Sequence, residues 1–442
     1  MENTPVWTAL ADYRTALYQC LLRGRDATFD LCDALATAQS ASSFVHLALA
    51  PCYQRRFSSL YQALTNGKIE HAALRRLAVR SAPVPPPGER LLLAVDASTI
   101  ARPYARTSPD RTLVQVPAQG HVLPHGGTLT RPGWSYSCVA VVPSTPRAWT
   151  PTLATARIPS DATATTVGAI QLAVLVPLLP LRPLCLADGG YSTVGWLQAT
   201  AALPLDQLIR AATTRVLYRP APPPTGQRGR PCLDGARFKG SDPATHGTPD
   251  QTWAGTEAGN TPVRVRAWSA LHLRQARDIP LTVLCRTRYT MHGPVHLWLW
   301  WVGGPLPPLD QIGALYAARF GIEHGFKADK GELLWATPHL RTPEQMDTWT
   351  ALVAAVHNEV GLARPLAQAH RLPWEAADRP LSFAQVRRDL PRLFVQCGSP
   401  AAAPRPRGKS PGRAPGLSPP RAPRHPVIHK GSRKRATPAH PR

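Results

Sequence analysis

The stretch "YAARFGIEHGFKADK", residues 316–330, places one carboxylate, Glu323, between the cations Arg319 and Lys330. At about 100° of rotation per residue, Tyr316, Arg319, Glu323 and Lys330 fall within a stripe about 60° wide on one face of a helix. If a carboxylate on this face meets a metal ion while the cations beside it meet phosphate, Glu323 is the candidate ligand. The stripe is about 21 Å long, so its two ends would contact different parts of a long substrate such as DNA.

A plainer interpretation is a solvent-exposed helix on which Arg319 and Glu323 form an i,i+4 ion pair worth about 0.3–0.5 kcal/mol. Gly321 and Gly325 argue against it, because each costs a helix about 1 kcal/mol relative to alanine. The two glycines predict a helix that another backbone approaches closely. Asp329, about 240° around the helix from Glu323, is predicted to face the opposite side.

The composition indicates a polyanionic partner. Lys and Arg number 51 against 27 Asp and Glu, a net charge of +24 in 442 residues. A protein this basic most often binds nucleic acid. Because 44 of the 51 cations are Arg, GC-rich coding is an alternative source of the bias, although it does not explain the deficit of acids.

The remaining composition predicts a cytoplasmic, nucleoid-associated protein that is not inserted in a membrane. The eight cysteines form no C-x-x-C pair, which favours reduced thiols over disulfides or a zinc site. The first residues have no secretory signal pattern. The longest apolar run, residues 171–187, contains three prolines and an arginine and is too short to cross a bilayer.

Two further carboxylates follow apolar runs that are typical of buried strands. Asp96 ends the run in "LLLAVDAST", and Asp188 ends the run in "RPLCLADGGYS". Acids at strand ends face the ligand-binding edge of a parallel sheet, although a single Asp there is more often a turn former or a helix cap. Two such acids plus Glu323 in a basic chain favour a site for Mg²⁺, since carboxylates are its preferred ligands.

The pattern of helices, strands and turns predicts an α/β protein of six parts. They are an N-terminal helical domain (1–85), the first part of a catalytic core (86–210), a β-rich insertion (211–303), the second part of the core (304–370), a helical segment (371–398) and a tail (399–442). The tail has 11 cations and no acid, which predicts a disordered basic segment. Residues 57–80 fit a DNA-binding helix-turn-helix or an ordinary helical hairpin, and the hairpin is favoured.

Three weaker signals concern DNA contacts. Arg210 and Arg215 flank the end of the last core strand. The sequence supports equally that they contact DNA phosphate and that they do not. The string "RGRP" at 228–231 resembles a minor-groove motif, but a loop is favoured. The alternating tryptophans Trp298, Trp300 and Trp301 are expected in the core rather than as a stacking platform for bases.

The motifs together resemble the DDE transposases of bacterial insertion sequences that carry a Y-R-E-K signature. The resemblance rests on "DAST" at Asp96, "DGGY" at Asp188 and the spacing of Tyr316, Arg319, Glu323 and Lys330. It extends to "GWSYS" (133–137) and "WATPHLRTPEQMDTWTALV" (335–353). It implies a ribonuclease H-like fold with a β insertion before the glutamate, binding of terminal inverted repeats, and Mg²⁺-dependent cleavage and strand transfer. The run "HGFKADKGELLW" departs from the family pattern and leaves a role for Lys327 in doubt.

The sequence therefore predicts a DNA transposase that acts as a homo-oligomer on terminal inverted repeats and target DNA. Asp96, Asp188 and Glu323 would be catalytic and bind two Mg²⁺ ions, for which Mn²⁺ could substitute. Tyr316, Arg319 and Lys330, with Arg210 and Arg215, would contact DNA. Two alternatives remain open at this point: a metal-dependent nuclease that cuts without joining, and a catalytically retired protein that only binds DNA.

Overall fold

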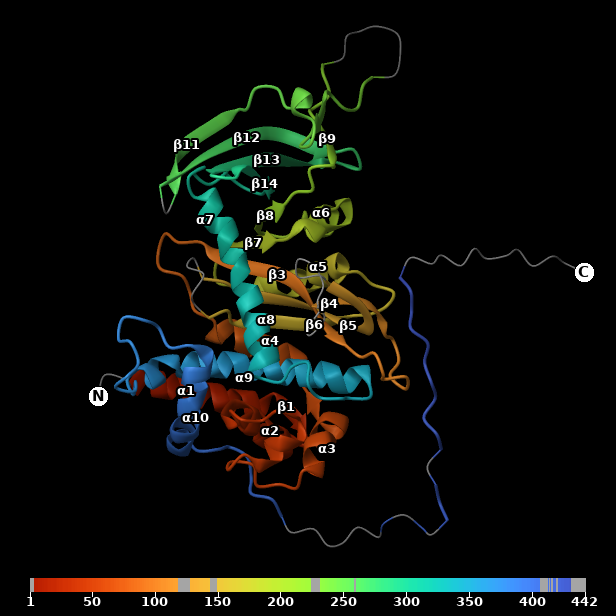
Figure 1. The fold of residues 1–442 in the computed structure, drawn as a ribbon, viewed down its shortest axis with the longest axis vertical. Helices are drawn as coiled ribbons and strands as arrows, with labels where there is room; N and C mark the ends of the chain where they lie inside the picture. The colour runs from red at the N-terminus through yellow and green to blue at the C-terminus, as the bar shows by residue number, and fades with distance from the viewer. Residues whose placement is uncertain are drawn as a thin grey trace, which may run out of the picture.

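The computed structural model describes residues 4–117, 128–143, 149–223, 231–257, 260–405, 412, 414, 416–418 and 420–430. In Figure 1 a long twisted sheet fills the upper and middle parts of the molecule, and a layer of helices lies below it. No helix in these ranges is both long enough and apolar enough to cross a membrane. The "RGRP" string lies almost wholly outside the described residues.

One mixed sheet contains twelve strands in the order β10-β9-β12-β13-β14-β8-β7-β3-β5-β4, with β11 beside β12 and β6 beside β5. The strands are β3 (Leu91–Ala101), β4 (Thr112–Pro117), β5 (Thr128–Val141), β6 (Thr152–Ile158), β7 (Pro183–Ala187), β8 (Asp206–Arg210), β9 (Val216–Tyr218), β10 (Arg237–Lys239), β11 (Gln251–Glu257), β12 (Thr261–Leu273), β13 (Ala276–Thr290) and β14 (Gly293–Val302). Two short strands, β1 (Leu21–Arg23) and β2 (Lys68–Ile69), pair separately.

The centre of the sheet changes from antiparallel to parallel pairing at β3. Strand β3 is antiparallel to β5 and β5 to β6, whereas β3 is parallel to β7 and β7 to β8. Helices α5 (Ala164–Leu175) and α6 (Val194–Thr200) provide the crossovers β6–β7 and β7–β8. All five residues of β7 are buried, as expected for a parallel strand covered on both faces.

Strands β9–β14 lie between residues 216 and 302 and continue the same sheet. Strand β14 pairs antiparallel with β8, with Leu299 opposite Arg210, so the insertion adds strands to the core rather than forming a detached sheet. Trp298, Trp300 and Trp301 are all buried, which confirms that they belong to the core.

The helical layer combines both ends of the chain. Its helices are α1 (Thr4–Gln19), α2 (Arg25–Thr37), α3 (Ser58–Asn66), α4 (His71–Ser81), α9 (Pro343–Gln368) and α10 (Phe383–Cys397). Short 3-10 helices are η1 (Val45–Leu49), η2 (Val176–Leu178) and η4 (Pro243–Thr245). The Tyr13 hydroxyl on α1 donates to the Ala355 carbonyl on α9 at 2.8 Å. Strand β2 lies between α3 and α4, so the expected helix pair has a short strand in its connection.

Part of the C-terminal tail has a defined position, so the expectation of a disordered tail is wrong for residues 425–430. The His425 amide donates to the Arg106 carbonyl, and the Ile428 amide donates to the Arg111 carbonyl. Ile428 also forms a parallel bridge with Thr112 at the start of β4. The composition of the tail could not indicate this structure, because the tail amides bond backbone carbonyls more than 300 residues away in the chain.

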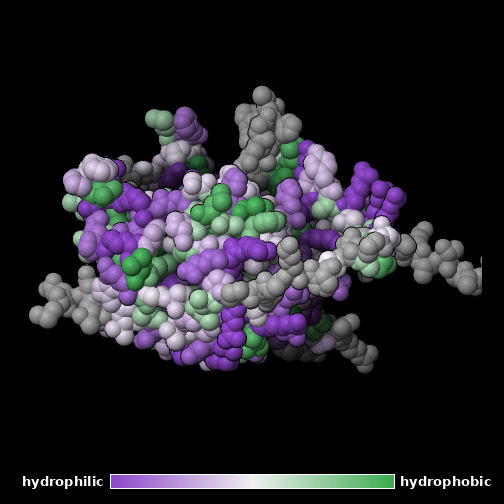
Figure 2. All heavy atoms as spheres, turned by 90° about the horizontal axis from the view of Figure 1, so that it is seen from below, coloured by the Kyte–Doolittle hydropathy of each residue, from purple (hydrophilic) through white to green (hydrophobic). Residues whose placement is uncertain are grey.

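Figure 2 shows the helical end of the molecule from below. Hydrophilic and hydrophobic residues are interspersed over this face. Such a mixture is ordinary for a protein surface, because apolar atoms contribute about half of it.

Candidate active site

Asp96 lies in the middle of β3, not at the end of the strand as expected. The parallel pairing with β7 ends at Val95 opposite Ala187, but β3 continues to Ala101 along β5. The residues after Asp96 are more polar, so they look like a turn in sequence, yet Ser98 and Ile100 are buried in alternation as a strand requires. Asp96 and Asp188 are therefore the first residues after the last β3–β7 pair and lie beside each other.

Local hydrogen bonds orient both aspartates. The Asp96 Oδ1 accepts from the Ala97 amide at 2.7 Å. The Asp188 Oδ1 accepts from the Gly190 amide at 2.9 Å and caps the 3-10 helix η3 (Gly189–Tyr191). Asp188 thus has the capping role that is ordinary for an Asp after a strand, in addition to its place beside Asp96.

The glutamate helix is divided into α7 (Ile312–Ala317), the 3-10 turn η5 (Ala318–Phe320) and α8 (Gly321–Gly331). Figure 1 shows this run descending from the insertion past the centre of the sheet to α9. The expected single α-helix is therefore tightened around Arg319. Tyr316 and Glu323 remain its neighbours, because the Arg319 guanidinium lies over the Tyr316 ring at 5.9 Å and bonds Glu323 one turn later.

Arg319 joins the carboxylates of β3 and α8. Its Nη1 donates to the Asp96 Oδ2 at 3.0 Å, and its Nη2 donates to the Glu323 Oε1 at 2.8 Å. The Arg319 side chain is 8 % exposed, whereas the Glu323 side chain is 50 % exposed. The pair is thus not the solvated surface contact of the plainer interpretation.

The charges of Asp188 and Glu323 both act on Asp96. Burial, with the negative charges of Asp188 and Glu323, raises the pKa of Asp96 to about 6, although the Ala97 amide and the Arg319 cation act in the opposite direction. A carboxylate that is destabilised by two neighbouring carboxylates is typical of a site that attracts cations. The repulsion of Asp96 by Asp188 and Glu323 is the reason to consider the three residues together.

The donor set suits a divalent cation, but the described carboxylates do not yet surround one. Within the described ranges, no three His, Cys, Asp or Glu side chains are close enough together to hold a metal ion. Arg319 lies between Asp96 and Glu323 and supplies positive charge there. Oxygen ligands of this kind fit Mg²⁺ or Mn²⁺, provided that the guanidinium moves aside.

The predicted DNA-contacting residues occupy different positions around the acids. Tyr316 is buried, and burial raises its pKa; the charges of Arg210 and Asp188 also act on it. Its hydroxyl has no hydrogen-bond partner among the described residues. Arg210 is exposed at the end of β8, and Arg215 is exposed in the turn before β9. Arg215 makes no contact with these acids in the part of the chain that is described.

Lys330 is bonded to the strand that carries Asp96. Its Nζ donates to the Thr99 carbonyl at 3.0 Å and lies 5.7 Å from the centre of a Trp335 ring. Burial lowers the pKa of Lys330. The ammonium therefore fastens α8 to β3 in this structure.

The close approach predicted at Gly321 and Gly325 is present, but the approaching group is a side chain. A Cβ at Gly321 would lie 2.9 Å from the Thr150 Cγ2, and one at Gly325 would lie 2.7 Å from the Thr150 Oγ1. Asp329 faces α9 as expected, where His357 Nδ1 lies 2.7 Å from its Oδ1. No local sequence signal marked Thr150 or His357.

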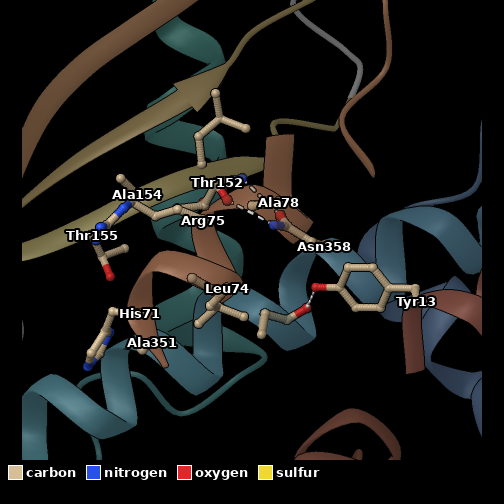
Figure 3. Close-up of a pocket in the computed structure, with 13 residues that line it drawn as sticks. Tyr13, His71, Leu74, Arg75, Ala78, Thr152, Ala154, Thr155, Ala351 and Asn358 are labelled. Carbon is tan, nitrogen blue, oxygen red and sulfur yellow. Dashed lines mark hydrogen bonds between the residues drawn. The ribbon is translucent and has the colours of Figure 1, made fainter. Parts of the chain in front are cut away.

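Three pockets in the described structure lie away from the acids. Figure 3 shows one of about 40 Å³ between α4, β6 and α9, beside the Asn358–Thr152 and Tyr13–Ala355 hydrogen bonds. Asp96, Asp188 and Glu323 line none of these three pockets.

Comparisons with known proteins give one family match. A family model described as DDE superfamily endonuclease matches residues 16–274, which include Asp96 and Asp188 and end before Glu323. No curated protein matches the chain. Among solved structures, a chain in the cryo-EM structure of the piggyBac transposase synaptic complex with hairpin DNA is similar, with a TM-score of 0.43 and 8 % identity over 86 % of this chain and 74 % of that chain.

Proposed function

This chain belongs to the DDE superfamily endonucleases, and we propose its function from that membership. We propose that it is a DNA transposase, which binds the ends of an insertion sequence and catalyses DNA cleavage followed by strand transfer. The observation that carries the proposal is that Asp96 and Asp188 directly follow the last β3–β7 pair, while Arg319 bonds both Asp96 and Glu323. DNA is the proposed substrate because the net charge of +24 favours a polyanion.

The strand order supports a ribonuclease H-like core. Strands β6, β5 and β3 are antiparallel neighbours, and β7 and β8 follow on the other side of β3 as parallel strands. Helices α5 and α6 provide the crossovers to the parallel pair, and β9–β14 form the insertion before the glutamate helix. In this order Asp96 lies on β3, and Asp188 directly follows β7, the parallel neighbour of β3.

Asp96, Asp188 and Glu323 would hold the divalent ions, Mg²⁺ or Mn²⁺, which supply Lewis-acid stabilisation of charge at the scissile phosphate. Asp96 must be ionised to serve as a ligand, which a pKa of about 6 permits at neutral pH. Arg319 keeps the Asp96 and Glu323 carboxylates on one side of the site until substrate arrives. Its guanidinium is then free to make a bidentate contact with a phosphate.

The other proposed contacts follow from position. The Tyr316 hydroxyl is buried beside Arg319 and has no partner among the described residues, so it would donate to a phosphate oxygen only after a movement that exposes it. Arg210 is exposed on the Asp188 side and can contact the backbone of DNA that lies across the site. Lys330 positions β3 through Thr99 in the absence of DNA, and Arg215 would reach DNA only further from the acids. A homo-oligomer on paired ends, acting on DNA in the cytoplasm, completes the proposal.

The test uses the full-length chain and duplexes that carry the DNA flanking its gene. With Mg²⁺ or Mn²⁺ we expect cut ends and then products joined to a second duplex, and with EDTA we expect neither. Cut ends without joined products would identify the nuclease alternative. Bound but uncut DNA under all metal conditions would identify the DNA-binding alternative.

A further inference from the structure

The C-terminal segment 425–430 is fixed along the free edge of the sheet. The His425 amide donates to the Arg106 carbonyl at 2.8 Å, and the Ile428 amide donates to the Arg111 carbonyl at 2.7 Å. Ile428 pairs in parallel with Thr112, the first residue of β4. The blue segment at the right of Figure 1 reaches the sheet at this edge.

Side chains hold the same segment at both ends. The Arg111 side chain is buried; its Nη2 donates to the His425 carbonyl at 3.0 Å, while its Nε and Nη1 donate to the Ser108 and Arg102 carbonyls. At the other end the Lys430 Nζ donates to the Pro159 and Ala162 carbonyls at 3.0 and 2.7 Å. Backbone and side-chain hydrogen bonds thus hold residues 425–430 together in one position on the sheet.

The pairing register places this segment near the acids. Thr112 lies opposite Gly133 on β5, and Gly133 lies opposite Ala101, five residues beyond Asp96 on β3. Five residues along a strand cover about 16 Å, and three strand spacings cover about 14 Å. The docked segment therefore lies about 20 Å from Asp96.

The docked segment brings cations close to this edge. Arg421 and Arg424 directly precede it and are exposed, and Arg106, whose carbonyl accepts from the His425 amide, is exposed as well. The Lys430 ammonium is already bonded to two carbonyls, and the nearby carboxylate of Asp110 is paired with Arg157. Exposed cations that adjoin a segment fixed to a sheet edge, about 20 Å from a proposed phosphodiester-cleaving site, match the charge of a nucleic-acid backbone.

We propose that residues 421–430, anchored to the sheet edge through residues 425–430, form a strap that binds the phosphate backbone of DNA on one side of the cleavage site. The proposal rests on the proposed function, because it takes DNA to lie across the acids. At about 3.4 Å per base pair, 20 Å corresponds to about six base pairs. The strap is expected to contact DNA at about that distance from the cut, rather than at many positions as a loose basic tail would.

Ile428 offers a matched pair of variants that leaves every charge in place. Ile428→Pro removes the amide that donates to Arg111 and disfavours the bridge with Thr112. Ile428→Ala keeps the amide and changes only a side chain that is 39 % exposed. Tryptic cleavage after Arg421 and Arg424 reports docking directly, and we expect it to accelerate in Ile428→Pro alone.

The experiment is a hydroxyl-radical footprint and a salt titration of binding with the full-length chain in EDTA, on duplexes ending at the cleavage position. Wild type and Ile428→Ala are expected to protect backbone about six base pairs from that end. Ile428→Pro is expected to lose this protection and to bind several-fold more weakly. The magnitude of its slope of log K against log salt should be lower by about 2, since Arg421 and Arg424 would each stop neutralising a phosphate and each such loss reduces the slope by about 0.9.

Three results would overturn the strap. One is full protection in Ile428→Pro with its tail released. Another is that deletion of residues 421–442 weakens DNA binding whereas Ile428→Pro binds DNA as wild type does. The cations would then bind DNA without being docked. The third is tighter DNA binding by Ile428→Pro, which would mean that the docked segment blocks the DNA-binding surface. None of these results depends on DNA cleavage. If the wild-type chain binds DNA but never cuts it, the proposed function is refuted and the strap is not.

Discussion

Arg319 connects the two halves of the site through one guanidinium. It bonds Asp96 on β3 and Glu323 on α8, and it has little exposure to water. A cation placed between carboxylates offsets their repulsion, which a metal ion could also do. Arg319 therefore occupies the position in which positive charge is needed.

We predict that Arg319→Met lowers the free energy of unfolding by about 2 kcal/mol without divalent ions, because two carboxylates lose their partner. Mg²⁺ should restore part of this loss in the variant and should stabilise wild type less. Urea denaturation with and without Mg²⁺ measures both effects. Equal destabilisation under the two conditions would mean that Arg319 does not stand where an ion binds.

The raised pKa of Asp96 gives the reaction a pH dependence. Burial and the charges of Asp188 and Glu323 raise this pKa to about 6. Because the ionised form is needed, the cleavage rate at limiting Mg²⁺ should fall as the pH drops from 7 to 5, most steeply near pH 6. The same shift means that the folded state binds the proton more tightly than the unfolded chain, so this group's contribution to stability is largest below about pH 4 and declines as the pH rises to about 6. An Asp96→Asn variant should lack that decline in denaturation experiments across the same pH range.

The three candidate acids could be selected from sequence because their neighbours in the chain carry information. Asp96 and Asp188 follow apolar runs, and Glu323 shares a helix face with Arg319. The continuation of β3 beyond Asp96 could not be predicted, because it depends on pairing with β5 rather than on local polarity. The bonds from Arg319 to Asp96 and from Lys330 to Thr99 likewise join residues that are distant in the chain.

Helix α8 is held against the loop that contains Thr150. Gly321 and Gly325 of α8 lie over Thr150, whose Oγ1 also donates to the Gly321 carbonyl at 3.3 Å. Helix propensity alone would favour alanine at Gly321 and Gly325 by about 1 kcal/mol each. The contact with Thr150 therefore opposes propensity and fixes the distance of Glu323 from β3.

We predict that Gly321→Ala destabilises the protein by about 1–3 kcal/mol, because its Cβ would lie 2.9 Å from the Thr150 Cγ2. Thr150→Ser removes that methyl group and should rescue Gly321→Ala. It should not rescue Gly325→Ala, whose Cβ would meet the Oγ1 that serine retains at 2.7 Å. Thermal denaturation of the single and double variants measures this, and rescue of both glycine variants or of neither would contradict the packing.

Both ends of the chain are joined by a buried ionic cluster. Arg14 on α1 bonds Asp33 on α2 at 2.9 Å and Glu359 on α9 at 2.6 Å, and its guanidinium lies 3.8 Å from the centre of the Phe394 ring on α10. Burial raises the pKa of Glu359. The N-terminal helices thus depend on the C-terminal helices for their core.

Arg14→Met should lower the free energy of unfolding by about 3–5 kcal/mol, because it leaves buried carboxylates without their cation. Arg182→Met is a matched control: Arg182 is half exposed, and its partner Asp206 is also bonded by Arg90. The control should cost no more than about 1 kcal/mol. Similar losses for the two variants in urea denaturation would show that the cluster does not join the ends.

The arrangement of the whole molecule was only partly accessible from sequence. The β-rich character of 211–303 could be predicted from alternation and turns, but not the pairing of β14 with β8 that merges it with the core. The docking of residues 425–430 at β4 also has no local pattern, because it uses backbone groups of the Arg106–Thr112 region. Such long-range pairings depend on the completed fold.

The most direct test of the catalytic assignment is a cleavage and strand-transfer assay with Glu323→Gln beside Asp329→Asn, two carboxylates on one helix that face opposite ways. Glu323→Gln keeps the shape and removes the charge, so it should abolish cut and joined products in Mg²⁺ while binding end DNA within about twofold of wild type. Asp329→Asn alters a buried contact with His357, so it should lose stability but cut at nearly the wild-type rate per folded molecule. Normal cleavage by Glu323→Gln, or loss of cleavage in folded Asp329→Asn alone, would contradict the assignment.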